Sequence, residues 1–251
     1  MPVVNFMGTA SGHEVHKRAG RQGITKDTKT SFELKNQVMK QLLFFAIAIA
    51  IASSGCSQAT NQKNAKHVGG NCEGCEAIYE GSVPFEKLTN AATLPDYNEA
   101  GPKLEISGTV YHRDGKTPAK DVVLYVYHTD QTGHYTPTPD AKDWGKRHGR
   151  IRGWMKTDKN GFYHFYTLKP APYPGTNIPA HIHITLKEPD KNEYYVDEYL
   201  FDGDPFLTTT ERNRQEKRGG SGIISLEQKN EMLHGKRDIV LGLNIPGYDT
   251  P

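Results

Sequence analysis

The sequence Pro179-Ala180-His181-Ile182-His183-Ile184-Thr185-Leu186 has the composition of a β-strand. Residues two apart lie on the same face of a strand, so His181 and His183 lie side by side while the isoleucines face the other way. Two parallel imidazoles supply half of a metal site, because neutral imidazole binds iron, copper and zinc. Two histidines on a solvated strand face are the alternative interpretation.

The chain from Leu104 onward continues this pattern, with apolar residues that alternate with polar ones or form short β-branched and aromatic runs. Strands are expected over residues 104–110, 122–127, 162–167, 180–187, 198–201 and 239–243. Asp114-Gly115 and Asn160-Gly161 supply turns, and only residues 226–233 have the spacing of a short helix. Many short strands with turn signals predict an all-β fold, an antiparallel β-sandwich with long loops.

The residues before this domain have the order of a bacterial export signal. Met39-Lys40-Gln41 is a short basic start, and Leu42 to Ala52 is an unbroken apolar run. The run is shorter than the roughly 20 residues of a membrane-spanning helix but suits the apolar part of a secretory signal. Ser53-Ser54-Gly55-Cys56 resembles a lipobox, in which cleavage before Cys56 leaves that cysteine to be acylated. A buried core helix is the alternative interpretation of the apolar run.

Three parts are therefore expected along the chain. Residues 1–55 form a signal region that is removed, residues 56–75 a lipidated tether, and residues 76–251 the β-sandwich domain. Met39 is a second candidate for the start codon. The polar stretch Ser57 to Gly70 cannot bury much apolar surface, so it predicts a flexible tether. The expected location is the bacterial cell envelope, with the protein lipid-anchored and facing the periplasm or the outer membrane.

Charge and cysteine content argue against several other classes of protein. The formal net charge is +2, and the most basic segment, Arg212 to Arg218, lacks the aromatic residues that stack on bases, so it is expected to be a solvated loop. Cys72 and Cys75 would lie outside the cytoplasm, where disulfides persist. A zinc site would need two further ligands, and a redox motif usually has a βαβ background. A local disulfide at the end of the tether is the favoured interpretation.

Five sequence blocks resemble, in order, those of the intradiol ring-cleavage dioxygenases. Tyr127 to Tyr135 is similar to the block that carries this family's first iron-binding tyrosine, and Pro179 to His183 is similar to its paired-histidine strand. The other similar segments are residues 149–154, 157–163 and 168–174, with a later turn at 201–204. The resemblance covers residues 104–204.

This resemblance implies an Fe(III) site that binds a catechol-type diol and cleaves its ring with O2 between the two hydroxylated carbons. Carried over by position, Tyr135 and Tyr173 would be tyrosinate ligands, and His181 and His183 imidazole ligands. Tyr173 lies where the family's displaceable tyrosine lies, so it would leave the iron as substrate binds and take up the substrate's proton. A phenolate is a hard donor, and coordination favours the ionised form of a tyrosine whose ordinary pKa is about 10.

The expected partners follow from the same features. They are a small aromatic diol, O2 and, through the lipid anchor, a membrane, with no nucleic acid. An oligomer is left open.

One position departs from the family's pattern. The family commonly has an arginine three residues before the first histidine, where it stabilises charge developing on the ring, and this chain has Ile178 there. Arg150 and Arg152 are candidates to supply that charge, although strand-edge arginines facing solvent are an equally good interpretation. Asn177 offers a hydrogen bond without charge, and Glu198 is a weak candidate for a residue behind the ligands.

Two other functions are compatible with the sequence. Ile106–Val110 and Thr157–Tyr163 also resemble transthyretin-like and carboxypeptidase-regulatory-like sandwiches, which bind or brace and do not catalyse. Such modules have no reason to carry the four-ligand set. The same site holding zinc or copper for storage would give a colourless or blue protein, whereas Fe(III)–tyrosinate is expected to be red-brown.

Replacing Cys56 by alanine tests the lipoprotein hypothesis. A single acyl chain anchors a protein only marginally, so the several chains of a bacterial lipoprotein are expected to keep the wild type in the membrane fraction. The Cys56→Ala variant should be released or remain unprocessed, as measured by fractionation and by the mass of the mature protein. A variant that is processed and fractionates as the wild type does would contradict the hypothesis.

Overall fold

Strand β2 (Lys103–Tyr111) shows how the alternation of the sequence becomes structure. The computed structural model describes residues 67–248, all within one compact unit. In β2 every second residue is buried, and Leu104, Ile106 and Val110 are fully buried while their neighbours are only partly covered. Because side chains alternate across a strand, β2 turns one face to the core and the other outward.

The elements within residues 67–248 are mostly short strands. The strands are β1 (Ala91–Thr93), β2, β3 (Val123–Tyr127), β4 (Arg152–Lys156), β5 (Phe162–Leu168), β6 (His181–Lys187), β7 (Glu193–Tyr195), β8 (Tyr199–Phe201), β9 (Ile223–Ile224), β10 (Leu226–Lys229), β11 (Met232–Lys236) and β12 (Ile239–Val240). The helices are α2 (Gly145–His148), α3 (Thr209–Arg214) and the 3-10 helices η2 (Cys75–Glu80) and η3 (Phe85–Lys87). None of the helices in this part of the chain is long and apolar enough to cross a bilayer.

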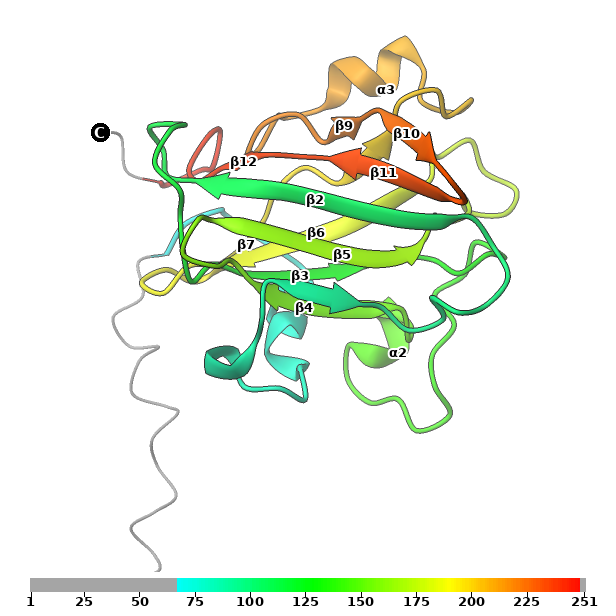
Figure 1. Cartoon of the computed structure of the whole chain (residues 1–251), viewed down its shortest axis with the longest axis horizontal. Helices are drawn as coiled ribbons and strands as arrows, with labels where there is room; N and C mark the ends of the chain where they lie inside the picture. Colours follow the sequence, from blue (N-terminus) through cyan, green and yellow to red (C-terminus); the bar gives the residue numbers. More distant parts are fainter. Residues whose placement is uncertain (1–66, 249–251) are drawn as a thin grey trace, which may run out of the picture. The chain divides into compact units, whose positions relative to one another are not determined.

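The strands form two sheets with an apolar core between them (Figure 1). The first sheet has the order β1-β5-β2-β11-β10, with β12 also paired to β2. The second has the order β4-β3-β6-β8-β9, with β7 paired to β6. Aliphatic and aromatic side chains of β2, β5, β3 and β6 form one core cluster. The all-β sandwich expected from the sequence is therefore confirmed.

The sheets are mixed, and not antiparallel throughout as we expected. β11 and β12 run parallel to β2, β1 runs parallel to β5, and β9 runs parallel to β8. The ladders of β3 with β4 and with β6 are antiparallel. Alternation predicts which face of a strand is buried but not the direction of its neighbour, so the parallel pairs left no mark in the pattern.

Residues 226–233 form a hairpin, so the short helix suggested by their spacing was wrong. β10 and β11 pair in antiparallel register from Leu226↔Gly235 to Lys229↔Met232. The turn begins at Asn230, whose φ of 53° is the left-handed conformation that two-residue hairpin turns require. Leu226 and Leu233 pack against the core from neighbouring strands, and their separation in sequence resembled two helical turns.

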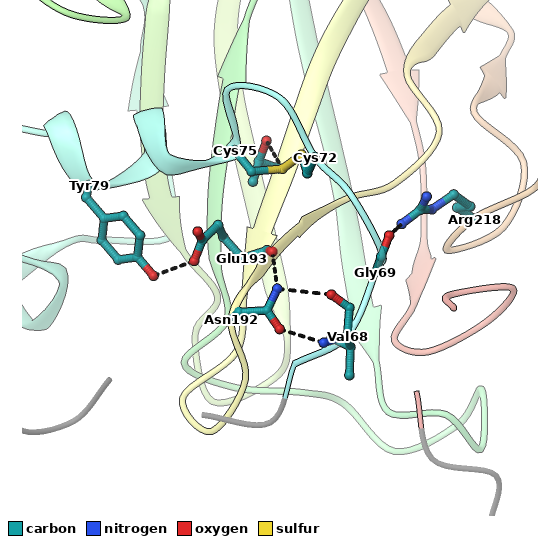
Figure 2. The surroundings of a disulfide bond; sticks show 9 residues. Val68, Gly69, Cys72, Cys75, Tyr79, Asn192, Glu193 and Arg218 are labelled. Carbon is teal, nitrogen blue, oxygen red and sulfur yellow. Dashed lines mark hydrogen bonds between the residues drawn. A yellow bond between two sulfur atoms is a disulfide. The ribbon is translucent and has the colours of Figure 1, made fainter. Parts of the chain in front are cut away.

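The first described residues already pack on the sandwich (Figure 2). Val68 is buried, its N–H donates to Asn192 Oδ1 (2.6 Å), and its carbonyl accepts from Asn192 Nδ2 (3.0 Å). The carbonyl of Gly69 accepts from Arg218 Nη2 (2.8 Å), and its N–H donates to the carbonyl of Pro246 (2.7 Å). The flexible tether expected over residues 57–70 therefore does not include its last residues.

The local disulfide between Cys72 and Cys75 is confirmed. Cys75 begins η2, whose Ala77 and Ile78 pack in a small cluster with Val123 and Tyr125 of β3. This segment thus covers part of the outer face of the second sheet. The signal region, the lipidation site and the rest of the tether lie outside the described residues.

The basic segment 212–218 was expected to be a solvated loop, and this is wrong for its first residues, which are helical, and for its last residue, which is buried. Arg212 and Arg214 lie in α3, where both are exposed in part. Arg218 is 2% exposed, and its guanidinium lies 3.5 Å from the ring centroid of Tyr195 in β7. Arg218 therefore connects β7 to the N-terminal segment.

Candidate metal centre

Strand β6 presents both histidines on the outer face of the second sheet. Ile182 and Ile184 belong to the core cluster, so His181 and His183 point away from it. His183 lies opposite Tyr127 of β3 in the ladder, and His181 lies opposite β8. The two imidazole rings are 4.7 Å apart between centroids and nearly perpendicular, at 87°. The sheet thus fixes the histidine pair before any ligand is considered.

The two tyrosines singled out in the sequence meet this histidine pair. Tyr135 Oη lies 2.7 Å from Tyr173 Oη and 2.7 Å from His183 Nε2. Tyr173 Oη lies 3.1 Å from His181 Nε2. The four side chains come from two loops and one strand, and they form one hydrogen-bonded chain. We call them the four converging side chains.

Close contact between two loops brings the tyrosines together. Gly133 has a φ of 78°, and a Cβ at this position would lie 2.2 Å from the carbonyl oxygen of Pro172, so a larger residue would push the loops apart. Thr129 Oγ1 donates to the carbonyl of Ala171 (2.6 Å). These contacts fix the two tyrosine-bearing loops against each other.

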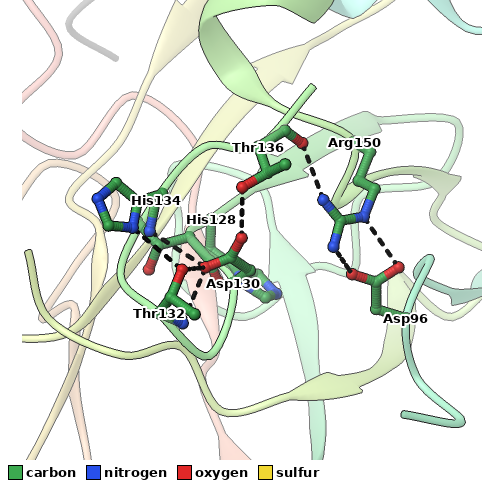
Figure 3. A network of polar contacts seen from close by, with 8 residues as sticks. Asp96, His128, Asp130, Thr132, His134, Thr136 and Arg150 are labelled. Carbon is green, nitrogen blue, oxygen red and sulfur yellow. Dashed lines mark hydrogen bonds and ion pairs between the residues drawn. The ribbon is translucent and has the colours of Figure 1, made fainter. Parts of the chain in front are cut away.

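Asp130 shapes the loop that carries Tyr135 (Figure 3). Its carboxylate accepts from the N–H and Oγ1 of Thr132 (2.8 and 2.6 Å), from Oγ1 of Thr136 (2.6 Å) and from the N–H of His134 (3.2 Å). Burial by itself would raise the pKa of Asp130, but these hydrogen bonds lower it to about 2. The carboxylate is therefore ionised at neutral pH and holds the loop in one conformation.

The two arginines considered as sources of positive charge are bound elsewhere. Arg150 makes a two-point contact with Asp96, with Nη2 2.7 Å from Oδ2 and Nε 3.2 Å from Oδ1, and also donates to the carbonyl of Thr136 (3.2 Å) (Figure 3). Arg152 pairs with Glu80 at 2.6 Å. A surface pocket beside both arginines is lined by neither the tyrosines nor the histidines of the site. Both guanidinium groups therefore brace the structure around the site.

Most of the segment that joins Tyr173 to His181, residues 174–178, is exposed, whereas Pro179 and Ala180 are buried. Ile178 is 46% exposed, and Asn177 is exposed as well. Among residues 67–248, no hydrogen bond or ion pair joins a lysine or arginine to any of the four converging side chains. Positive charge that would act on a bound ring is thus missing from the immediate contacts.

Each imidazole of the pair is held through its second nitrogen. His183 Nδ1 lies 2.6 Å from Glu198 Oε1, and His181 Nδ1 lies 2.8 Å from the carbonyl oxygen of Pro179. An acceptor at Nδ1 places the proton there and leaves Nε2 as an electron-pair donor. Burial lowers the pKa of His181, which favours its neutral form. Both Nε2 atoms point at the tyrosines.

Glu198 is the residue of the site that the sequence indicated least. It immediately precedes β8, and only the pairing of β8 with β6 brings it beside His183. Burial by itself would raise the pKa of Glu198, but the hydrogen bond with His183 lowers it to about 2. Ligand atoms of His181, His183 and Glu198 lie within 4.8 Å of one another. Glu198 contacts the Nδ1 side of His183, however, whereas Tyr135 contacts the Nε2 side.

The protonation of the two tyrosines follows from their surroundings. Burial raises the pKa of both Tyr135 and Tyr173, and the hydrogen bond with Tyr173 raises that of Tyr135 further. The phenols are therefore neutral unless a strongly charged cation ionises them. Two phenol oxygens and two neutral imidazoles are a donor set that suits iron better than calcium or magnesium.

Known proteins resemble the region that contains this site. A family model described as Dioxygenase matches residues 79–217, more than half of the chain. Catechol 1,2-dioxygenase 1 of Acinetobacter lwoffii is 32% identical over 146 residues, which are 51% of this chain and 44% of that protein. An intradiol ring-cleavage dioxygenase of Aspergillus niger is 35% identical over 102 residues, 38% of this chain and 29% of that protein. The chain belongs to the intradiol ring-cleavage dioxygenase family.

The match of this chain to its relatives is partial. The chain spans less than half the length of the curated relatives it matches. Among solved structures, the dioxygenase domain of a dioxygenase carbohydrate-binding protein fusion from Streptomyces sp. SirexAA-E has a TM-score of 0.48 at 23% identity, covering 64% of this chain and 94% of that one. The region matched by the family model contains all four converging side chains.

His128 lies buried beside the site and titrates unlike a free histidine. Its Nδ1 is 2.7 Å from the carbonyl oxygen of Thr129, and its Nε2 is 2.7 Å from Thr167 Oγ1. Burial lowers the pKa of His128 to about 4. The His128 imidazole is therefore neutral in the folded protein throughout the physiological range.

Stability should fall between pH 7 and pH 5, in part because of His128. The unfolded chain binds the proton near pH 6.5 and the folded protein only near pH 4, so acidification between these values favours unfolding. The contribution of neutral His128 to the free energy of unfolding is complete above pH 6.5, and about 2 kcal/mol of it is lost at pH 5. Urea unfolding at both pH values should show a smaller loss for His128→Gln than for the wild type. An equal loss in both proteins would contradict this assignment.

Proposed function

We propose that this chain is a non-haem Fe(III) dioxygenase that cleaves a catechol-type ring between its two hydroxylated carbons. O2 is the second substrate, and the product is a muconate-type diacid. The observation that carries the proposal is the convergence of Tyr135, Tyr173, His181 and His183 in one hydrogen-bonded chain. Relatives named as catechol and intradiol dioxygenases support the same class of reaction.

The four converging side chains fit iron by the chemistry of their donor atoms. Two phenol oxygens become hard anionic ligands when they lose their protons, and two imidazoles offer neutral Nε2 atoms already directed at the phenols. Two tyrosinates would leave a ferric site with a net charge near +1, which disfavours the ferrous state. When bound there, iron would supply a Lewis acid for the two diol oxygens and electronic contact between the ring and O2.

Tyr173 is the side chain best placed to move and to accept a proton. Both phenols have two hydrogen-bond partners within the site, but only the loop of Tyr135 is held by the carboxylate of Asp130. Tyr173 is followed by the exposed residues 174–178, which leave its loop less constrained on that side. Burial raises the pKa of Tyr173, so its released phenolate oxygen is basic enough to take the proton of a substrate hydroxyl.

Ile178, which stands where the family commonly has an arginine, should lower the rate of ring cleavage. Arg150 and Arg152 are paired with Asp96 and Glu80, so they do not replace a guanidinium at the position of Ile178. One preorganised charge in an active site is worth about 10²–10³ in rate. We therefore expect slow turnover, or a preference for electron-rich rings.

The cellular setting and the competing functions complete the proposal. The order of residues from Met39 to Cys56 supports an enzyme lipid-anchored at the bacterial cell envelope.

A non-catalytic transthyretin-like sandwich gives no reason for four converging donors. Storage of zinc or copper does not require two phenols that share one hydrogen bond.

Substitution of the ligands should remove the metal and the colour together. Alanine at His181 or His183 should abolish iron uptake, and Tyr135→Phe or Tyr173→Phe should bleach the visible band, because each change deletes one donor atom. Iron content and absorption after reconstitution measure the effect. Tyr166→Phe, on β5 of the other sheet, is the matched control and should retain both. Full zinc occupancy with no uptake of iron by the wild type would contradict the assignment.

The reaction is tested by incubating iron-loaded protein with a panel of catechols under air. Oxygen consumption and formation of a muconate-type diacid are expected, with a rate about 10²-fold or more lower for Tyr173→Phe if Tyr173 accepts the proton. Ile178→Arg should increase the rate by supplying the missing charge, whereas Ile178→Leu, which keeps the site uncharged, should not. A shift in colour on adding catechols without oxygen uptake across the whole panel would favour a binding module.

A further inference from the structure

Tyr127 lies face to face between two imidazole rings on the outer face of the second sheet. Its ring centroid is 4.4 Å from that of His183 at an interplanar angle of 18° and 3.8 Å from that of His148 at 5°. The contact with His183 follows from the ladder of β3 and β6, in which these two residues lie opposite each other. The contact with His148 comes from α2, a separate part of the chain.

Besides Tyr127, three further residues contact the imidazole of His148. It is 5% exposed, and its Nδ1 is 2.8 Å from Tyr125 Oη. The ring of Trp144 lies 5.1 Å from the ring of His148. A Cβ on Gly74 would lie only 2.9 Å from His148 Nε2, so the backbone of Gly74 lies against the imidazole. His148 is thus fixed between Tyr127 and the loop that carries the disulfide.

The Cys72–Cys75 loop makes two further contacts, one with β6 on the same sheet face and one with α2. Cys75 is 2% exposed, and its Sγ is 3.8 Å from Oγ1 of Thr185, which follows His183 by two residues on the same face of β6. Glu73 in the loop pairs with Arg147 of α2 at 2.7 Å. The disulfide (Figure 2) therefore closes the loop at the position where the loop meets both β6 and α2.

The stack supplies a constraint on His183 that its two hydrogen bonds do not. The bonds from Nδ1 to Glu198 and from Nε2 to Tyr135 hold the two nitrogens, but the ring can still tilt about the line that joins them. A flat ring parallel to its face restricts this tilt and so fixes the direction of Nε2. Metal ligands depend on such supporting contacts for their orientation.

We propose that Tyr127 and His148 are positioning residues for His183, and that the Cys72–Cys75 loop supports them through Gly74. The consequence for iron rests on the proposed function, whereas the positioning of the ring is a property of the protein without metal. Breaking the disulfide should loosen His148, then Tyr127, and finally His183. The contacts run without a gap from the disulfide to the metal site.

The positioning of the ring is measured first on the metal-free protein. In NMR spectra of histidine-labelled protein, the ring currents of Tyr127 should shift the ring protons of His183, which are identified by their loss in His183→Gln. The shift should persist in Tyr127→Phe, which keeps a flat ring, and should disappear in Tyr127→Leu. His183 signals that are the same in Tyr127→Leu and in the wild type would overturn the proposal, whether or not iron binds.

The support by the loop is tested with a matched pair of glycine variants. Gly74→Ala introduces a Cβ against His148 at a φ of +84°, while Gly115→Ala introduces one at a φ of +66° with nothing within 4 Å. Gly74→Ala and the double variant Cys72→Ser/Cys75→Ser should move the His183 signals, and Gly115→Ala should leave them in place. Thermal unfolding identifies any variant that is merely unfolded. Gly74→Ala keeps all three ring side chains of the stack, so it still tests the proposal if Tyr127→Leu does not fold.

The consequence for the metal is measured as the rate of iron release to a chelator and as the position of the visible band. Tyr127→Leu, Gly74→Ala and the double serine variant should release iron about tenfold faster or more. Tyr127→Phe, Gly115→Ala and Tyr166→Leu should stay near the wild type. Equal release rates and bands in all variants would overturn the proposal. A wild type that binds no iron would overturn the proposed function, and the NMR spectra of the metal-free protein would then decide whether the stack positions His183.

Discussion

The ladder between β3 and β6 places Tyr127 opposite His183 and Tyr125 opposite Thr185. Because side chains alternate, the same ladder sends Val126, Ile184 and Leu186 into the core. A slip of one residue would exchange the two faces, turning the histidines inward and the isoleucines outward. The large apolar contribution of the buried face therefore fixes the register, and through the register it fixes the direction of the imidazoles. Packing in the core and the geometry of the site are two results of one pairing.

The tyrosines depend on a different kind of constraint, since both lie on loops. Ionised Asp130 closes one loop on itself, and Gly133 lets that loop approach Pro172 closely. The polar groups around Asp130 are paired with one another, so the loop of Tyr135 has little freedom although it lies near the surface. The mutual hydrogen bond of the phenols then gives each buried hydroxyl a partner without any ligand. Contacts within the protein therefore hold the four converging side chains in place before any substrate binds.

The sequence predicts those features that follow from local pattern. The alternation around His181 and His183 predicted the strand and the shared face, and the resemblance to a known family named Tyr135 and Tyr173, which the structure places beside them. Glu198 could not be found this way, because its position beside His183 arises from the pairing of distant strands. His148 likewise meets Tyr127 only through tertiary contact.

Other differences also arise from contacts between residues far apart in the sequence. The polar residues before Cys72 suggested a tether, yet Val68 is buried because Asn192 satisfies both its backbone groups. Parallel pairing of β11 with β2 depends on the route of the chain between sheets, which no period of hydrophobicity records. Ion pairs of Arg150 and Arg152 with acids from the preceding segment could not be assigned from spacing alone.

The hydrogen bond from Gly69 to the carbonyl of Pro246 joins the place where the chain enters the domain to the place where it leaves. The backbone of Gly247 also lies near that of His67. Adjacent ends are the geometry that permits circular permutation and insertion of one domain into a loop of another. Within the described residues, the two ends of the sandwich thus have the geometry that insertion into a host loop, or new ends in an exposed turn such as Asp114-Gly115, would require.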